Sequence, residues 1–353
     1  MSKPKVYVYI PSDRNGASHK AFEQAGCEIA LGDPTWRNTR GATLETFQSK
    51  GKGAVALIGA RMEGLNIDRT ALAVFPDLRI LARYNIGYDD IELDDCTELG
   101  ILVTHAPVES NWGGVAEGAF AMMLSLLKRL PALDRHVREG GWRKPGLNGT
   151  FLGRRQDGYE GITVGIVGLG RVGSRFADLL APWRVRVLAH DPYVDESKFV
   201  HHNATPVDLD TLLRESDVVT LHCNLSRETR GMIDARALGL MKPTAILMNT
   251  ARGPLVDEGA LYDALAADRL RGAALDVFAF EPVPKQSPLL SLGDKVLLAP
   301  HMVGGAGGGR QGQNLEWATK AVIAALRGEV PRHVVNEEAV PRWRERFGGK
   351  RLI

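Results

Sequence analysis

The feature that most constrains this chain is a glycine-rich turn between an apolar run and a helix-like stretch. The run 163–167 leads directly into Gly168-x-Gly170-x-x-Gly173, and a second apolar run then ends in Asp191. The first glycine of such a turn permits a tight strand-to-helix connection. The second lets the backbone approach a pyrophosphate, and the third lets the helix pack closely on the strand. Glycines alone are weak support, but the two strands and the acid complete the pattern of a dinucleotide-binding unit.

Residues around this turn indicate how a dinucleotide would be held. The N-terminus of the predicted helix offers unpaired N–H groups and a positive dipole end to phosphates, which implicates Arg171 and Val172 beside the glycines. Asp191 stands where a carboxylate can accept both hydroxyls of an adenosine ribose, and it would repel a 2′-phosphate. Its neighbours 192–194 include no arginine to neutralise one. We therefore expect NAD rather than NADP, with Arg171 and Lys198 as cations that could still approach that pocket.

Composition narrows the class of protein. The chain has 353 residues, enough for about two domains, with 44% hydrophobic and 24% charged residues. A net charge of +2 implies no strong field for nucleic acid or an anionic membrane. Cys27, Cys96 and Cys223 are scattered without metal-ligand spacing, so we expect reduced thiols, no metal and a cytoplasmic protein. No apolar run approaches membrane-spanning length.

Apolar runs that alternate with helix-like stretches predict two α/β units. The expected strands are 5–10, 54–58, 78–83, 101–104, 163–167, 185–190, 217–222, 244–249, 272–277 and 295–299. A helix at about 309–327 leaves the second sheet, and too little chain remains for a third domain. We predict two doubly wound parallel-sheet domains: a discontinuous flavodoxin-like substrate domain over 1–114 and 304–353, and an inserted Rossmann NAD-binding domain over 115–303.

Three other segments are interpreted from their composition. Residues 115–137 predict one long helix whose apolar surface is too broad for a single core, so it should bridge the domains and meet a partner subunit. Residues 140–160 are rich in Gly, Arg and Lys and predict a loop. The basic tail 341–351 is interpreted as a solvated or partner-packing extension rather than a nucleic-acid-binding arm.

Consecutive strands of the second unit end in polar side chains, among them Arg252, Glu281 and His301. Ligands of doubly wound sheets bind beyond the carboxyl ends of strands, so these three should converge near the nicotinamide. Hydride transfer to a keto acid needs a cation for its carboxylate, an acid for the developing alkoxide, and a group that orients the acid. A guanidinium, an imidazole and a carboxylate fit those roles in that order. Each alone would more often be an ion pair or a packing residue, but together they favour catalysis.

The chain resembles the D-isomer-specific 2-hydroxyacid dehydrogenases over roughly residues 75–335. The resemblance rests on the segments 161–173, 241–253, 271–278 and Pro300-His301. It implies an Arg–Glu–His catalytic site at Arg252, Glu281 and His301, and a homodimer clasped through the nucleotide domain. It also implies a nicotinamide contact for Asp276. Further cofactor contacts are expected at Thr250, Ala251, His301 and Gly304.

The same resemblance implies where the substrate binds. The segment 83–91 is similar to the loop whose backbone amides hold the substrate carboxylate, which implicates Ile86 and Gly87. Arg61 and Arg252 would complete the substrate site. The chain departs from the family pattern at Asn85, where a glycine is usual, and at Gly118, where a bulkier residue is common. We expect specificity to depend on the side chains of three residues, namely Arg61, Tyr84 and Trp112.

The leading hypothesis is NAD-linked interconversion of a small (R)-2-hydroxy acid and its 2-keto acid, with glyoxylate, hydroxypyruvate and phosphohydroxypyruvate all open. Phosphoglycerate dehydrogenase activity would use Arg61 or Arg83 for the phosphate. Formate dehydrogenases of the same superfamily are disfavoured because glutamine is expected there in place of Glu281. From a different class, an NAD(H)-sensing corepressor would keep a similar triad, although the chain lacks a long disordered interaction tail.

Overall fold

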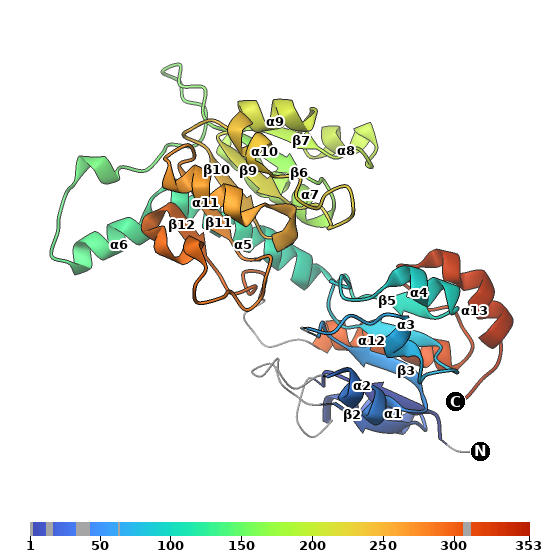
Figure 1. Ribbon diagram of the computed structural model, residues 1–353. Coiled ribbons are helices and arrows are strands. Elements are labelled where there is room, and N and C mark those ends of the chain that lie inside the picture. Colours follow the sequence, from blue (N-terminus) through green and yellow to red (C-terminus); the bar gives the residue numbers. More distant parts are fainter. Residues whose placement is uncertain (1–2, 12–16, 33–42, 63, 306–311) are drawn as a thin grey trace. The chain divides into compact units, whose positions relative to one another are not determined.

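The computed structural model describes residues 3–11, 17–32, 43–62, 64–305 and 312–353. The chain forms two compact units (Figure 1). The first comprises Met1–Val108 and Gly307–Ile353, and the second comprises Glu109–Ala306. The chain therefore enters the second unit once and returns once.

The first unit is built on a five-stranded parallel sheet of order β2-β1-β3-β4-β5, the flavodoxin-like order. Its strands are β1 (Lys5–Val8), β2 (Glu28–Leu31), β3 (Ala54–Gly59), β4 (Ile80–Arg83) and β5 (Leu102–Thr104). Its helices are η1 (Ala17–His19), α1 (Lys20–Gln24), α2 (Leu44–Gly51), α3 (Arg69–Leu72), α4 (Leu93–Glu98), α12 (Gly312–Leu326), η8 (Glu337–Ala339) and α13 (Val340–Phe347). Successive residues of β1 are buried on opposite faces of the sheet. Val6 packs in the cluster that contains Val322 of α12, and Tyr7 packs in the cluster that contains Phe47 of α2.

The second unit is built on a seven-stranded parallel sheet of order β12-β11-β10-β9-β6-β7-β8. Its strands are β6 (Thr163–Val167), β7 (Arg186–His190), β8 (Thr205–Pro206), β9 (Val218–Leu221), β10 (Ile246–Asn249), β11 (Gly272–Leu275) and β12 (Val296–Leu298). This is the doubly wound order of dinucleotide-binding domains, with one strand added at the β12 edge.

Helices cover both faces of this second sheet. The helices of this unit are α5 (Glu109–Leu127), α6 (Leu130–Arg138), η3 (Pro145–Leu147), α7 (Arg171–Leu180), η4 (Ala181–Trp183), α8 (Glu196–His201), α9 (Leu209–Glu215), α10 (Ala235–Leu240), η5 (Gly253–Leu255), α11 (Glu258–Ala266), η6 (Pro288–Ser291) and η7 (Gly293–Lys295). Met123 of α5 and Phe176 of α7 pack with Met248 on one face. Leu238 of α10 and Leu261 of α11 lie in the cluster on the other. None of the helices in the described ranges combines the length and apolar character needed to span a membrane.

The predicted fold class, two parallel-sheet α/β domains, is confirmed, but two strands were missed. β2 and β8 are edge strands, and β8 has only two residues. These two strands are short and partly or fully exposed, so they do not produce the continuous apolar run that marks a strand buried on both faces. The predicted helix at about 309–327 corresponds to α12, and its first three residues lie outside the described part of the chain.

The prediction of one helix over 115–137 was wrong. Helix α5 begins earlier and ends at Leu127, and α6 starts after Arg129, whose φ of 57° is left-handed. Pro131 lies in the first turn of α6, where its missing N–H and fixed φ suit a helix start. The Leu127 carbonyl, four residues before that proline, accepts a hydrogen bond from Thr150 N (2.8 Å) instead of continuing the helix.

The interpretation of 341–351 as a solvated or partner-packing extension was also wrong. The segment contains most of α13, and Trp343 is fully buried in the core of the first unit. The Trp343 Nε1–H donates to the Arg79 carbonyl (2.8 Å), and the Arg79 guanidinium lies over the Phe347 ring at 5.0 Å. The two aromatic residues are four apart and share one helix face, so α13 presents an apolar side that its basic composition conceals.

Candidate functional site

The glycine turn has the backbone that its three glycines were predicted to permit. Gly168 has a φ of +92°, and a Cβ there would lie 2.6 Å from the Cys223 nitrogen. A Cβ at Gly173 would lie 2.0 Å from the Gly168 carbonyl oxygen. Both contacts exclude any larger residue. At Gly170 a Cβ would meet nothing within 4 Å, so this position opens onto space beside the helix N-terminus.

The start of α7 and the end of β7 supply the groups expected to hold a dinucleotide. Gly170 is the N-cap of α7 without a side-chain cap, so the first-turn amides, including those of Arg171 and Val172, can serve a phosphate. Asp191 Oδ2 accepts from Leu169 N (2.8 Å), and Oδ1 accepts from Tyr193 N (3.0 Å). Each carboxylate oxygen has two lone pairs, so ribose hydroxyls can still be accepted. These residues fit NAD.

His301 and Glu281 meet at the carboxyl edge of the second sheet. His301 follows β12, and its Nδ1 lies 2.9 Å from Glu281 Oε2. Glu281 Oε1 also accepts from Phe278 N (3.0 Å), which fixes the carboxylate plane. Because the carboxylate can only accept, His301 Nδ1 carries the hydrogen and Nε2 is the other reactive nitrogen. The His301 side chain is 44% exposed, so Nε2 can reach a bound molecule.

Asp276 holds the backbone around His301 in place. The buried carboxylate accepts from Met302 N (2.9 Å) and, with both oxygens, from Val303 N (3.2 Å). The Asp276 carbonyl accepts from His301 N (2.8 Å), and His301 has a left-handed φ of 55°. Burial raises the pKa of the Asp276 carboxyl. These bonds were not anticipated from the sequence, which suggested only a nicotinamide contact for this aspartate.

Arg252 lies on a loop that packs closely against the segment before Glu281. A Cβ at Gly253 would lie 1.9 Å from the Phe278 carbonyl carbon, so only glycine allows this approach. The Asn249 side chain closes the loop, donating to the Arg252 carbonyl (2.8 Å) and accepting from Ala251 N (3.1 Å). Sequence reasoning did not single out Asn249. A polar residue that ends an otherwise apolar strand was the available signal.

The remaining cofactor candidates lie on the same edge of the sheet. Strands β10, β11 and β12 are adjacent and parallel, so the segments that follow them leave at one edge. Thr250 is buried, and its Oγ1 makes no hydrogen bond within the described part of the chain. A buried hydroxyl without a partner is unusual and fits a site that a ligand completes. Gly304 lies against α5, where a Cβ would be 2.4 Å from Val115 Cγ2.

In the first unit, Arg61 and the Ile86–Gly87 pair follow the adjacent parallel strands β3 and β4. Arg61 is exposed. Arg83, considered above for phosphate binding, is fully buried, with Nη2 2.6 Å from Asp90 Oδ2. Tyr84 is also buried, and its hydroxyl donates to the Ile10 carbonyl. The predictions that Arg83 could bind a phosphate and that Tyr84 lines the pocket were therefore wrong.

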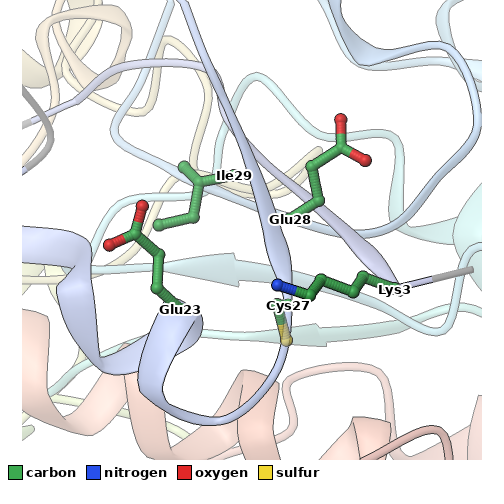
Figure 2. Close-up of a pocket in the computed structure, with 5 residues that line it drawn as sticks. All are labelled: Lys3, Glu23, Cys27, Glu28 and Ile29. Carbon is green, nitrogen blue, oxygen red and sulfur yellow. The ribbon is translucent and has the colours of Figure 1, made fainter.

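A shallow hollow lies elsewhere on the first unit, beside the edge strand β2 (Figure 2). It is lined by Lys3, Glu23, Cys27, Glu28 and Ile29. Burial raises the pKa of the Cys27 thiol, so it stays protonated and unreactive at neutral pH. None of the predicted site residues lines this hollow. Within the described ranges, no group of three or more His, Cys, Asp or Glu residues is arranged to hold a metal ion.

The chain is similar to known proteins of one family. The profile described as "D-isomer specific 2-hydroxyacid dehydrogenase, NAD binding domain" matches residues 120–303, all within the second unit. A glyoxylate reductase of Thermofilum pendens is 36% identical over 96% of this chain and 96% of its own length. A D-3-phosphoglycerate dehydrogenase of Mycobacterium bovis is 38% identical over 78% of this chain but only 51% of its own length.

Solved structures extend the likeness to the fold of the whole chain. A D-lactate dehydrogenase of Aquifex aeolicus, complexed with NAD and lactic acid, is 27% identical with a TM-score of 0.77. The match covers 96% of this chain and 98% of that one. The family resemblance and the predicted NAD cofactor are thereby confirmed. The chain belongs to the D-isomer-specific 2-hydroxyacid dehydrogenases, a family of NAD-linked oxidoreductases.

Proposed function

We propose that this protein interconverts a small (R)-2-hydroxy acid and its 2-keto acid. The observation that carries the proposal is the 2.9 Å bond between His301 Nδ1 and Glu281 Oε2 at the sheet edge where Arg252 also lies. An oriented imidazole and a guanidinium on the same sheet edge meet the two needs of keto-acid reduction, a proton donor and a carboxylate anchor.

His301 would act as the acid–base group. When bound, NADH supplies the hydride that the carbonyl carbon accepts. His301 Nε2 would protonate the carbonyl oxygen during reduction and accept the hydroxyl proton during oxidation. Glu281 holds the ring through Nδ1. Because Phe278 N fixes the Glu281 carboxylate, the ring orientation is set before a substrate arrives.

The substrate carboxylate would be bound by charge and by backbone amides. Arg252 offers a planar fork of N–H donors that matches a carboxylate in two parallel hydrogen bonds. The amides of Ile86 and Gly87 are the second proposed anchor, and exposed Arg61 is the further substrate contact.

Eleven residues of the second unit are proposed to contact the cofactor. The turn and the start of α7 would hold the pyrophosphate, and Asp191 would accept the adenosine ribose hydroxyls. The ends of β10, β11 and β12 would surround the nicotinamide half. The proposed contacts are Gly168, Gly170, Arg171, Val172, Gly173, Asp191, Thr250, Ala251, Asp276, His301 and Gly304.

We propose an unphosphorylated keto acid, glyoxylate first, as the substrate. The Thermofilum pendens relative named glyoxylate reductase matches nearly the whole chain, whereas the relative named phosphoglycerate dehydrogenase is matched over about half its length. Burial of Arg83 against Asp90 removes one of the two arginines considered for a phosphate. Small 2-keto acids such as hydroxypyruvate offer the same carboxylate and carbonyl to Arg252 and His301.

We also propose a cytoplasmic homodimer that forms through the 115–137 region of the NAD-binding unit, at the part of it that lies in α6 and at the segment after α6. Figure 1 shows α6 projecting away from the second sheet. Leu130, Val137 and Trp142 are 51%, 55% and 75% exposed there, an apolar surface that a partner would cover. The cytoplasmic location is proposed because Cys27, Cys96 and Cys223 are scattered free thiols, which suit a reducing compartment.

The test is NADH oxidation against a panel of 2-keto acids, with NADPH in parallel, for the natural protein and His301→Asn. Asparagine tolerates the left-handed backbone at this position and can still donate to Glu281, so the fold should persist. We expect turnover of glyoxylate with NADH, and kcat lower by about 10²- to 10⁴-fold in the variant. NADH should still bind the variant, because ten of the eleven proposed cofactor contacts remain. If the natural protein binds NADH but reduces no keto acid, the proposal is overturned in favour of an NAD(H)-sensing protein.

A further inference from the structure

We infer that His105 is a positioning residue for substrate binding, because it orients the amides expected to hold the carboxylate. Its role, which rests on the proposed function, would be to fix the Ile86–Gly87 peptide through the Ile86 carbonyl. Nothing in the sequence motifs drew attention to this histidine.

The topology of the first unit places His105 beside that loop. β4 and β5 are adjacent and parallel, with Ala82 paired to Thr104. The segments that follow the two strands therefore leave the same edge together. His105 is the first residue after β5, and the loop 84–87 follows β4 directly.

Two consecutive carbonyls of the loop are bound by this neighbouring segment. Ala106 N donates to the Asn85 carbonyl (3.2 Å), and His105 Nδ1 donates to the Ile86 carbonyl (3.2 Å). A carbonyl oxygen can only accept, so the Nδ1 of His105 carries the hydrogen. The two bonds point successive peptide units in the same sense, with their oxygens toward the 105–106 segment.

Peptide planarity then sets the direction of the two amides. In a trans peptide the N–H points opposite to the carbonyl, so Ile86 N–H and Gly87 N–H face away from the 105–106 segment. Neither amide donates a hydrogen bond to any residue in the described ranges. Two successive N–H groups that point outward form a binding place for an anion such as a carboxylate.

Other contacts hold the histidine backbone and the two ends of the loop, so the His105 Nδ1 bond can be removed without unfolding the loop. His105 N donates to the His333 carbonyl (3.3 Å), which fixes the backbone of the histidine. Its ring meets the Tyr88 ring edge-on at 5.7 Å and 75°, which limits rotation of the imidazole. At the base of the loop, the buried Arg83–Asp90 ion pair joins its two ends. Removing the Nδ1 donor should therefore let the Ile86–Gly87 peptide rotate without unfolding the loop.

Three substitutions of His105 test this role. In His105→Asn, the side-chain NH₂ stands close to the place of Nδ1 and can still donate to the Ile86 carbonyl. In His105→Gln, the NH₂ reaches the place of Nε2 instead, and in His105→Leu there is no donor. The natural protein and each variant are assayed for KM and kcat with the best keto acid, for inhibition by oxamate (an unreactive carboxylate analogue), and for NADH affinity.

We expect KM and the oxamate inhibition constant to rise by about five- to tenfold in the Leu and Gln variants, as for loss of one hydrogen bond. The Asn variant should stay near the natural values. kcat and NADH affinity should not change in any of the three. The role of His105 would be overturned if the natural protein and the Leu variant had equal KM, or if KM rose equally in the Asn and Leu variants. Either result would leave the proposed function intact. If the Leu variant does not fold, the Asn and Gln variants provide the same contrast. A natural protein that neither turns over keto acids nor binds oxamate would overturn both proposals.

Discussion

Single carboxylates in the second unit serve the fold and the proposed site together. Asp191 accepts one backbone amide of the glycine turn, that of Leu169, and one from the segment after β7, that of Tyr193. Asp276 accepts two amides of the turn after His301. An ionised carboxylate has about four lone-pair directions, so such a residue can hold backbone and still accept from a ligand. Substituting either aspartate will therefore change stability as well as cofactor affinity, and only His301→Asn separates chemistry from structure.

At this same scale, His222 should make the fold sensitive to acid. The imidazole is enclosed beside Phe176 and paired with Thr220, and burial lowers the pKa of His222 from 6.5 to about 3. At a pH between these two pKa values, His222 is protonated in the unfolded chain but neutral in the folded chain. Stability is therefore fully present above the unfolded pKa and falls as the pH drops, by about 1.4 kcal/mol per pH unit.

Urea unfolding of the natural protein and of His222→Gln, from neutral pH down to about pH 4, would measure this effect. The variant should have a shallower loss of stability. His201→Gln, at an exposed position on α8, is the matched control and should follow the natural protein. Identical slopes for His222→Gln and the natural protein would show that His222 is protonated in the folded state.

At the scale of elements, α5 lies unusually close to the turn that follows His301. A Cβ at Gly114 would be 2.7 Å from the Gly304 carbonyl oxygen, and a Cβ at Gly118 would be 2.3 Å from the Val303 carbonyl oxygen. Both neighbours are backbone atoms and cannot move aside by rotating a bond. The glycine at 118, a departure from the family pattern, thus has a packing reason in this chain.

Gly118→Ala should accordingly displace the 301–304 turn. We expect a loss of about 1–3 kcal/mol of stability, as for other overpacked sites, together with a lower kcat for keto-acid reduction. Gly113→Ala is the matched control on the same helix, since its Cβ would meet only the Glu109 side chain at 3.9 Å. That change should raise stability by about 0.4–1 kcal/mol, because alanine leaves the unfolded chain fewer conformations than glycine does. Equal stability of the two variants would contradict the close packing at Gly118.

At the scale of the whole molecule, the chain crosses between its two units twice, after Val108 and after Ala306. The proposed cofactor and catalytic residues belong to the second unit, and Ile86 and Gly87, the proposed carboxylate anchors, belong to the first. Sequence changes confined to one unit can therefore alter keto-acid affinity without altering NADH affinity, which is the contrast that the His105 variants exploit.

The proposed dimer gives a prediction at this scale. Val137→Glu would place a charge in the apolar surface of α6, where Val137 is 55% exposed. We expect a shift from dimer to monomer, measured by light scattering after size-exclusion chromatography, because burying an unpaired carboxylate is costly. Val200→Glu, at a 76% exposed valine on α8, is the control and should stay dimeric. A dimer that persists in Val137→Glu would place the interface elsewhere.

A feature of the fold could be predicted from the sequence where the residues that control it lie close together in the chain. Central strands such as β6 and β10 are buried on both faces and appear as continuous apolar runs, so they were found. Edge strands β2 and β8 lack that pattern and were missed. The break in the predicted helix at Arg129 was also missed, although Pro131 was a local signal for it; the bond from Thr150 to the Leu127 carbonyl, which the sequence does not show, replaces the helical one.

The sequence by itself determined the glycine turn, the acid after the second Rossmann strand and the strand-end residues Arg252, Glu281 and His301. These are short-range patterns, fixed by backbone conformations that only glycine allows and by the alternation of strand and helix. The tertiary structure alone decided that Arg83 is buried against Asp90 and that His105 binds the Ile86 carbonyl. Such partners come from different strands or opposite ends of a loop, and only the packed sheet brings their atoms within hydrogen-bond distance.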